Sequence, residues 1–166
     1  MKIVTTVIAY HHITIRDFRT DRPDFQAQHK IFDTLVEQNP TLFRISTSLQ
    51  EKRGPALFLT SQHHAPEPVD GHTHGEIAHL HLSSHEDCDH EPDGSAHVTL
   101  SLEDAKEVVG KGWGQRHLMS GRLGARIVGE GFTMLYGPMN EFEVEVMGRI
   151  IRAGARYMTG GMQVKV

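Results

Sequence analysis

The sequence predicts an α+β fold in which an antiparallel sheet of about five to seven strands is packed by about three helices. Three segments carry apolar residues at the spacing of one helix face, near residues 23–38, 102–110 and 140–158. Between them lie short apolar or alternating segments bounded by Gly, Pro and Asp, which are typical of strands and turns. Capping signals also mark where two of the helices begin.

The first half of the chain is expected to supply a helix and a hairpin. Residues 1–16 are rich in β-branched residues and favour strand structure. The first helix follows, and it should end before the Asn39-Pro40 pair because the residue before a proline disfavours helical backbone. Residues 42–49 and 56–60 are then expected as two strands joined by the polar turn EKRGP.

The middle of the chain predicts a second hairpin with a long acidic loop. The segments GEIAHLHL, at residues 75–82, and SAHVTL, at residues 95–100, indicate its two strands. Because side chains alternate across a strand, Ile77, His79 and His81 should share one face. The core face should then be formed by Ala78, Leu80 and Leu82. The same alternation leaves His97 opposite the apolar face of the second strand.

The second half of the chain adds two helices and two strands. Ser101 is a good N-cap for the helix at 102–110, and Asn140 with Glu143 forms a capping signal for the helix at 140–158. Residues 123–128 and 132–136 have strand character. Seven side chains are expected in the core: Leu80, Val98, Leu100, Val108, Phe142, Val146 and Ile150.

Size and composition limit the class of protein. A length of 166 residues predicts a single domain, residues 1–166. The net charge of −4 gives no reason to expect nucleic acid as a partner. With Cys88 as its one cysteine, the chain forms no intrachain disulfide, which favours a reducing compartment. The apolar start is too short for a signal peptide or membrane span, so we expect a cytoplasmic protein without membrane partners and of unknown oligomeric state.

Histidine is the compositional outlier, with 13 residues in the chain. Seven of them fall in one short window: His72, His74, His79, His81, His85, His90 and His97. If the two strands of the second hairpin pair with their apolar faces together, His79, His81 and His97 gather within about 5 Å on one polar face. Three imidazoles at that range could bind a metal or divide general acid and base work. Nearby carboxylates that could orient an imidazole or complete a ligand set are Glu76, Glu86 and Asp93.

Simpler interpretations stay open beside this one. Histidines on the outer face of an antiparallel hairpin are often only solvated polar residues. The strings HLH and PDGSAH partly resemble the two histidine motifs of cupins, but no Glu stands three or four residues beyond His81 and the long helices do not suit a jelly roll. The chain has no P-loop, GxGxxG, GxSxG or HExxH motif, so nucleotide, flavin and serine-hydrolase chemistry have no sequence support.

Four strings occur together and in order: GEIAHLHL, DGSAHVTLSLEDAKEVVGKGWGQRH, FTMLYGP and EVEVMGRIIRAGARYMTG. Over about residues 75–160 this pattern resembles the luciferase-like domain of small fungal and bacterial proteins. The resemblance implies that four residues line the pocket, and we expect these to be catalytic: Glu76, His79, His81 and His97. It implies substrate-binding neighbours at Trp113, Arg116 and His117, for which a core tryptophan and a solvated pair are the alternatives. The chain is also similar to accessory proteins of fungal biosynthesis, which guide cyclisations or isomerisations.

Three hypotheses follow for the histidine face. The leading one is an enzyme without metal or other cofactor, a cyclase, isomerase or lyase of secondary metabolism. It would act on a small, largely apolar metabolite and use the histidines for acid–base or polarising roles, a pericyclic step among the reactions it could promote. The second is a metal-dependent enzyme with Zn or Fe on His79, His81 and His97. The third is a module that binds a ligand without catalysis.

Overall fold

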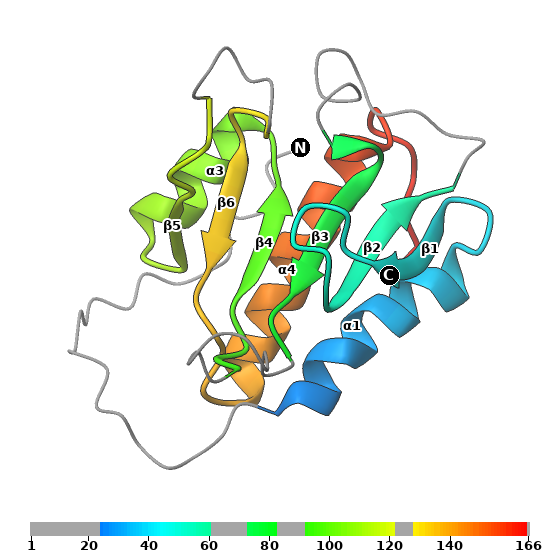
Figure 1. Ribbon diagram of the computed structural model, residues 1–166, viewed down its shortest axis with the longest axis horizontal. Coiled ribbons are helices and arrows are strands. Elements are labelled where there is room, and N and C mark those ends of the chain that lie inside the picture. Colours follow the sequence, from blue (N-terminus) through cyan, green and yellow to red (C-terminus); the bar gives the residue numbers. More distant parts are fainter. Residues whose placement is uncertain (1–23, 61–72, 83–91, 122–127, 166) are drawn as a thin grey trace.

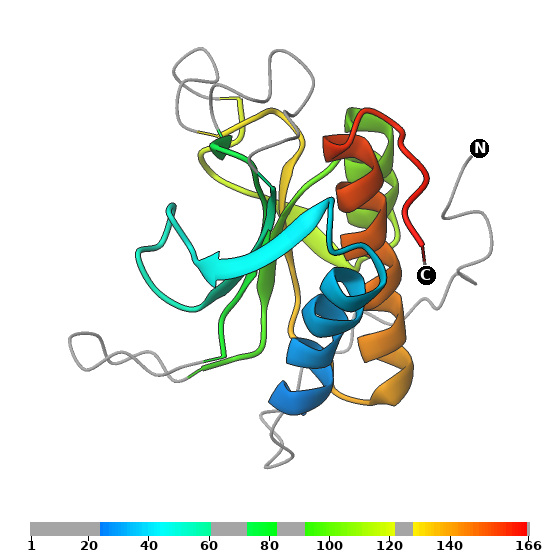
Figure 2. The same ribbon diagram turned by 90° about the vertical axis from the view of Figure 1, so that its right-hand side faces the viewer.

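The computed structural model describes residues 24–60, 73–82, 92–121 and 128–165. Within these ranges six strands form one sheet in the order β1-β2-β3-β4-β6-β5, and every neighbouring pair is antiparallel (Figure 1). Helices α1, α3 and α4 lie on one face of this sheet, as Figure 2 shows. The opposite face, called the open face below, carries no helix in the described ranges. The predicted α+β class, with its numbers of strands and helices, is therefore confirmed.

The elements fall close to the expected segments. The strands are β1 (Phe43–Thr47), β2 (Pro55–Leu59), β3 (Glu76–Leu80), β4 (Ala96–Thr99), β5 (Gly114–Arg116) and β6 (Phe132–Leu135). The helices are α1 (Phe25–Gln38), α3 (Leu102–Gly110) and α4 (Glu141–Met158). The short strand β5 was not expected from the sequence. The strand structure expected at residues 1–16 and 123–127 lies outside the described residues.

Side-chain caps fix where the helices begin. The side chain of Ser101 accepts a hydrogen bond from the backbone N–H of Asp104, and Asn140 accepts one from Glu143. Both contacts satisfy a backbone donor that has no partner inside its helix. The two predicted caps are therefore confirmed, and Asp24 caps α1 in the same way through the N–H of Ala27.

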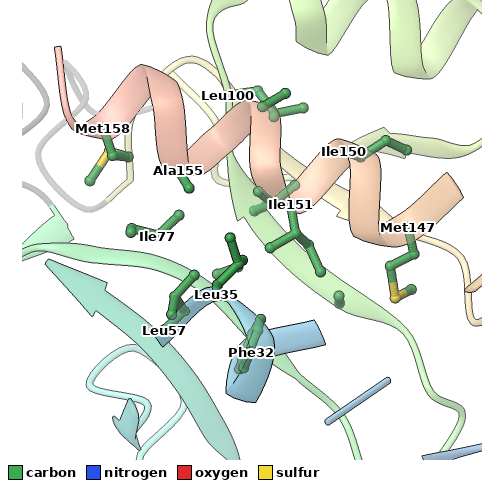
Figure 3. Packing of buried hydrophobic residues seen from close by; sticks show 14 of the residues in the cluster. Phe32, Leu35, Leu57, Ile77, Leu100, Met147, Ile150, Ile151, Ala155 and Met158 are labelled. Carbon is green, nitrogen blue, oxygen red and sulfur yellow. The ribbon is translucent and has the colours of Figure 1, made fainter. Parts of the chain in front are cut away.

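The hydrophobic core lies between the helices and the sheet. Figure 3 shows Phe32 and Leu35 of α1 meeting Leu57 of β2, Ile77 of β3 and Ile151 of α4. Six of the seven predicted core residues are at most 4 % exposed: Leu80, Val98, Leu100, Val108, Val146 and Ile150.

The prediction for the seventh core residue, Phe142, is wrong. Its side chain is 53 % exposed, and its ring lies 6.3 Å from the ring of Trp113. Phe142 continues the apolar stripe of Val146 by one more turn, but that turn is the first of α4. At this end of the helix its neighbour is a partly buried tryptophan and not the sheet. The stripe therefore runs past the part of the helix that the sheet covers.

A bulge in β3 changes which side chains reach the open face. Leu57 pairs with Ala78 and Phe58 pairs with Glu76, so Ile77 is an extra residue between two register positions. Such bulges re-aim the side chains beside them. Ile77 joins the core, where Figure 3 places it beside Leu57, and the expectation that it shares a face with the histidines is wrong. Glu76 instead lies on the histidine side, because it contacts His79.

Candidate functional site

Three histidines of the central hairpin converge on the open face. His79 of β3 and His97 of β4 are directly paired in the sheet, and their ring centroids are 4.7 Å apart. His81 lies just beyond β3, with its ring 4.8 Å from that of His97 and 5.3 Å from that of His79. The structure thus brings together the three residues that strand alternation placed on one face. They are not a solvated surface, since His79 is 1 % exposed and His97 is 6 % exposed.

A fourth side chain, Glu51, completes the group. It belongs to the turn between β1 and β2, which Figure 2 shows reaching over the open face. Its Oε1 lies 3.5 Å from His79 Nε2, 3.3 Å from His81 Nε2 and 3.6 Å from His97 Nδ1. One ligand atom from each of the four side chains lies within 4.8 Å of all the others. We call Glu51, His79, His81 and His97 the four-residue cluster.

Glu51 was not expected from the sequence. Its segment EKRGP has the composition of an ordinary polar turn, and nothing in that segment distinguishes a ligand from a solvated charge. The only available signal was the predicted pairing of residues 42–49 with 56–60, which places the turn at one end of the hairpin. How that turn bends toward β3 depends on contacts that the local sequence does not encode.

Two outer contacts orient the imidazoles. Nδ1 of His79 donates to Glu76 Oε1 at 2.7 Å, and Nδ1 of His81 is hydrogen-bonded to Ser95 Oγ at 2.7 Å. Nε2 of both histidines is therefore the nitrogen that faces Glu51. Partners of this kind on the remote nitrogen fix the ring orientation and are a regular feature of metal-binding histidines.

Glu76 itself does not enter the cluster. It is 1 % exposed, and both of its carboxylate oxygens are already engaged. Oε1 accepts from Ser48 Oγ at 2.7 Å as well as from His79, and Oε2 accepts from the backbone N–H groups of Leu49 and Gln50 at 2.8 and 3.3 Å. The structure thus places Glu76 behind His79, on the side away from Glu51.

The members of the cluster differ in their protonation states. The imidazoles of His79 and His81, which face its carboxylate, hold the pKa of Glu51 well below its usual range, although burial acts in the opposite direction. Burial also acts to lower the pKa of His79, but the neighbouring carboxylates of Glu51 and Glu76 outweigh burial and raise it. Burial lowers the pKa of His97 to about 3, and the nearby charges of other histidines add to that shift. At neutral pH, Glu51 is therefore ionised and His97 is neutral, which are the forms that bind metals.

The separations of Glu51 from the three histidines are close to those of side chains that share a metal ion. Ligands about 2.1 Å from one ion in a tetrahedral arrangement are about 3.4 Å from one another. The three distances from Glu51 Oε1 to the histidine nitrogens span 3.3 to 3.6 Å. In addition, His81 Nε2 is buried and has no partner with hydrogen-bond geometry in the described part of the chain. A buried polar atom left in this state is unfavourable, and a metal ion would satisfy it.

The three neighbours expected to bind substrate are distributed differently. The ring of His117 lies 4.7 Å from that of His97 and 5.0 Å from that of Phe132, so His117 adjoins the cluster. Arg116 instead hydrogen-bonds to Ser120, through Nη2 to the carbonyl oxygen at 2.9 Å. Trp113 packs toward α4, where it lines a small cavity with Val146, Met147 and Ile150. Of these three residues, only His117 contacts a member of the cluster.

His117 has a defined tautomer. Its Nδ1 accepts a hydrogen bond from the backbone N–H of Met119 at 3.2 Å, so a neutral ring carries its proton on Nε2. Burial lowers the pKa of His117, which favours this neutral form. His117 therefore offers one N–H donor beside the ring of His97.

Comparisons with known proteins agree with this part of the chain. A model of the luciferase domain family matches residues 74–154. Proteins named luciferase from Neonothopanus nambi and Armillaria mellea are 35 % and 33 % identical to the chain over 129 and 164 residues. These alignments cover 74 % and 92 % of the chain but 45 % and 58 % of the relatives, so the chain spans about half the length of the curated relatives it matches. The resemblance expected over about residues 75–160 is confirmed.

Two further comparisons bear on structure. No solved structure was found to match the chain. None of the helices in the described ranges combines the length and apolar composition that crossing a membrane requires. The matched segment contains Glu76 and all three histidines of the cluster, whereas Glu51 lies before it.

Proposed function

Taking as the premise that residues 74–154 belong to the luciferase domain family, we propose that the four-residue cluster is the metal centre of an enzyme that acts on a small molecule. One observation carries this proposal: a carboxylate oxygen lies at nearly equal distances, 3.3 to 3.6 Å, from nitrogens of three histidines. Side chains that bind one ion in a tetrahedral site lie at about such distances from one another, near 3.4 Å.

The outer contacts add support. Glu76 and Ser95 hold the remote nitrogens of His79 and His81, as expected for ligands whose orientation must be fixed. The cluster also faces solvent on one side, because the side chains of His81 and Glu51 are 24 % and 22 % exposed while His79 is buried. A substrate could therefore approach the centre from the side of Glu51 and His81.

The ligand set narrows the choice of ion. Three imidazoles and one carboxylate suit Zn²⁺ or Fe²⁺. A tetrahedral Zn²⁺ bound by all four side chains would have no open position, which is typical of structural zinc sites. An ion that takes six ligands keeps two positions for substrate, so a catalytic role favours Fe²⁺ or another octahedral ion.

The remaining residues fit a reaction that moves a proton near a polarised oxygen. A bound ion would act as a Lewis acid on a carbonyl or hydroxyl oxygen of the substrate. His117 adjoins His97 and can donate its Nε2–H to that substrate. Cyclisation, isomerisation or elimination on a largely apolar metabolite is the reaction class that such a site serves. The relatives' name supports an enzyme, but light emission is not part of the proposal.

A second candidate uses the same side chains without metal. His97 Nδ1 and His79 Nε2 are 2.9 Å apart, within hydrogen-bond distance, and His79 Nδ1 donates to Glu76. This chain of three groups could relay a proton between Glu76 and the open face. It would make the site an acid–base catalyst that needs no cofactor.

Metal analysis decides between the two candidates. The protein should be purified without a histidine tag, analysed by mass spectrometry for metals, and then dialysed against Zn²⁺, Mn²⁺ or, without oxygen, Fe²⁺. We expect about one equivalent bound, strongly reduced by Glu51→Gln and by His97→Ala. His29→Ala is the matched control, because His29 lies on α1 and pairs with Asp33. A wild-type protein that retains none of these ions would refute the metal centre and favour the relay.

A further inference from the structure

Glu76 connects the two halves of the four-residue cluster. One half is Glu51, carried by the turn between β1 and β2, and the other half is the three histidines, which lie in β3, just beyond β3 and in β4. We infer that Glu76 is a positioning residue that holds this turn against His79, so that Glu51 reaches the ion. The inference rests on the proposed metal centre. The role that it gives to Glu76 is neither binding of the ion nor proton transfer.

The turn is attached to Glu76 by three hydrogen bonds. Ser48 Oγ donates to Glu76 Oε1 at 2.7 Å, and the N–H groups of Leu49 and Gln50 donate to Oε2 at 2.8 and 3.3 Å. A carboxylate with several buried donors forms charge-assisted bonds, which are stronger than neutral ones. These bonds fix the backbone of the two residues directly before Glu51.

Ser48 extends the connection to Glu51 itself. Its hydroxyl donates to Glu76 and at the same time accepts the backbone N–H of Glu51 at 3.0 Å. The N–H of Ser48 is bonded to the carbonyl of Gly54 at 3.1 Å, which closes the turn. The path from Glu76 to Glu51 therefore runs through one serine hydroxyl.

The close approach of the turn to β3 depends on glycine. Gly54 has φ of +68°, and a Cβ at that position would lie 2.8 Å from the backbone oxygen of Leu80. Leu80 stands between His79 and His81. Any side chain at residue 54 would push the turn away from the strand that carries both histidines.

The bulge in β3 explains how Glu76 can fill this role. With regular alternation from His79, residue 76 would face the helices. The extra residue Ile77 lets Glu76 share the open face with His79, and Ile77 takes a place in the core. One irregularity thus serves both the core and the site. Glu76 is not placed to bind the ion itself, because it is 1 % exposed and His79 stands between it and the cluster.

The test compares metal affinity among variants. We expect Glu76→Gln to weaken the binding of Zn²⁺ about 10- to 100-fold, as other losses of a carboxylate behind a histidine ligand do. Ser48→Ala should weaken it in the same direction while leaving the carboxylate in place. Glu103→Gln is the matched control, since Glu103 is an exposed carboxylate in the first turn of α3.

A spectroscopic reading separates positioning from simple loss of stability. With Co²⁺ as the probe ion, the visible spectrum reports ligand geometry, and we expect it to change in Glu76→Gln and in Ser48→Ala but not in the control. If Glu76→Gln does not fold, Ser48→Ala decides the question alone. Wild-type affinity and an unchanged spectrum in the folded variants would overturn the inference while the metal centre stands. A wild type that binds neither ion would instead overturn the proposed function.

Discussion

Adding metal should stabilise the folded protein, because the cluster joins segments that come apart on unfolding. An ion that binds only the folded state adds about 2.7 kcal/mol when its concentration is 100 times the dissociation constant. For a chain of this length each kcal/mol raises Tm by about 2–4 °C, so the expected rise is about 5–11 °C. Thermal unfolding of metal-free protein with and without saturating Zn²⁺, followed by circular dichroism, measures this rise.

His97→Ala is the informative variant for this measurement. In the metal-free state the substitution removes the hydrogen bond to His79 and the ring contact with Phe132, which should cost about 1–3 kcal/mol. That baseline loss does not affect the reasoning, because the quantity of interest is the rise caused by metal within each variant. We expect the rise to disappear in His97→Ala and to persist in His29→Ala. An equal rise in both variants would show that the ion binds elsewhere, and the reasoning would fail.

Three further predictions concern acidity, the core and the proposed donor. Because the pKa of His79 is raised, a proton competes with the ion at Nε2, so metal affinity should rise with pH until that pKa is passed. Over the same pH range the metal-free protein should lose the part of its stability that protonated His79 contributes. Calorimetric titrations and unfolding curves at several pH values measure these two slopes, and a reversed slope would contradict the prediction. Val146→Asp should prevent stable folding, because it buries an unpaired charge. Phe142→Asp, four residues earlier on the same helix, should shift Tm by only a few degrees, because Phe142 is exposed. Equal losses of stability in the two variants would mean that the helix is oriented differently. His117→Ala should leave metal content unchanged and reduce turnover of the substrate once that is identified, and a loss of metal would make His117 a ligand instead.

Local patterns in the sequence predict much of this fold. Helix starts follow from Ser101 and Asn140, whose capping depends on residues only three positions away. The convergence of His79, His81 and His97 follows from alternation along two short strands and from the assumption that neighbouring strands pair. Each of these inferences uses information contained within a few residues, so a single sequence is sufficient for them.

The features that the sequence did not predict all depend on distant partners. Whether Ile77 faces the core is decided by the register of β2, where a bulge adds one residue. Whether Phe142 is buried depends on how far the sheet extends beneath α4. The apolar pattern of the helix does not indicate where its contact with the sheet ends. Whether Trp113 adjoins the histidines depends on the packing of α4, which takes that ring instead.

Glu51 shows most clearly why the site needed the structure. Three of the four proposed ligands come from the β3–β4 hairpin, but the fourth, Glu51, comes from the β1–β2 turn. The boundary between these two hairpins, called the seam below, is the pairing of β2 with β3, which the bulge interrupts. In the metal-free protein this seam is held on the open face by Glu76 and by the attraction between Glu51 and the histidines. A bound ion would join the two hairpins at the same place. Tighter metal binding would therefore also stabilise the pairing of β2 with β3. Backbone hydrogen exchange in β2 and β3 should therefore slow on metal binding more than exchange in α3, which contributes no ligand.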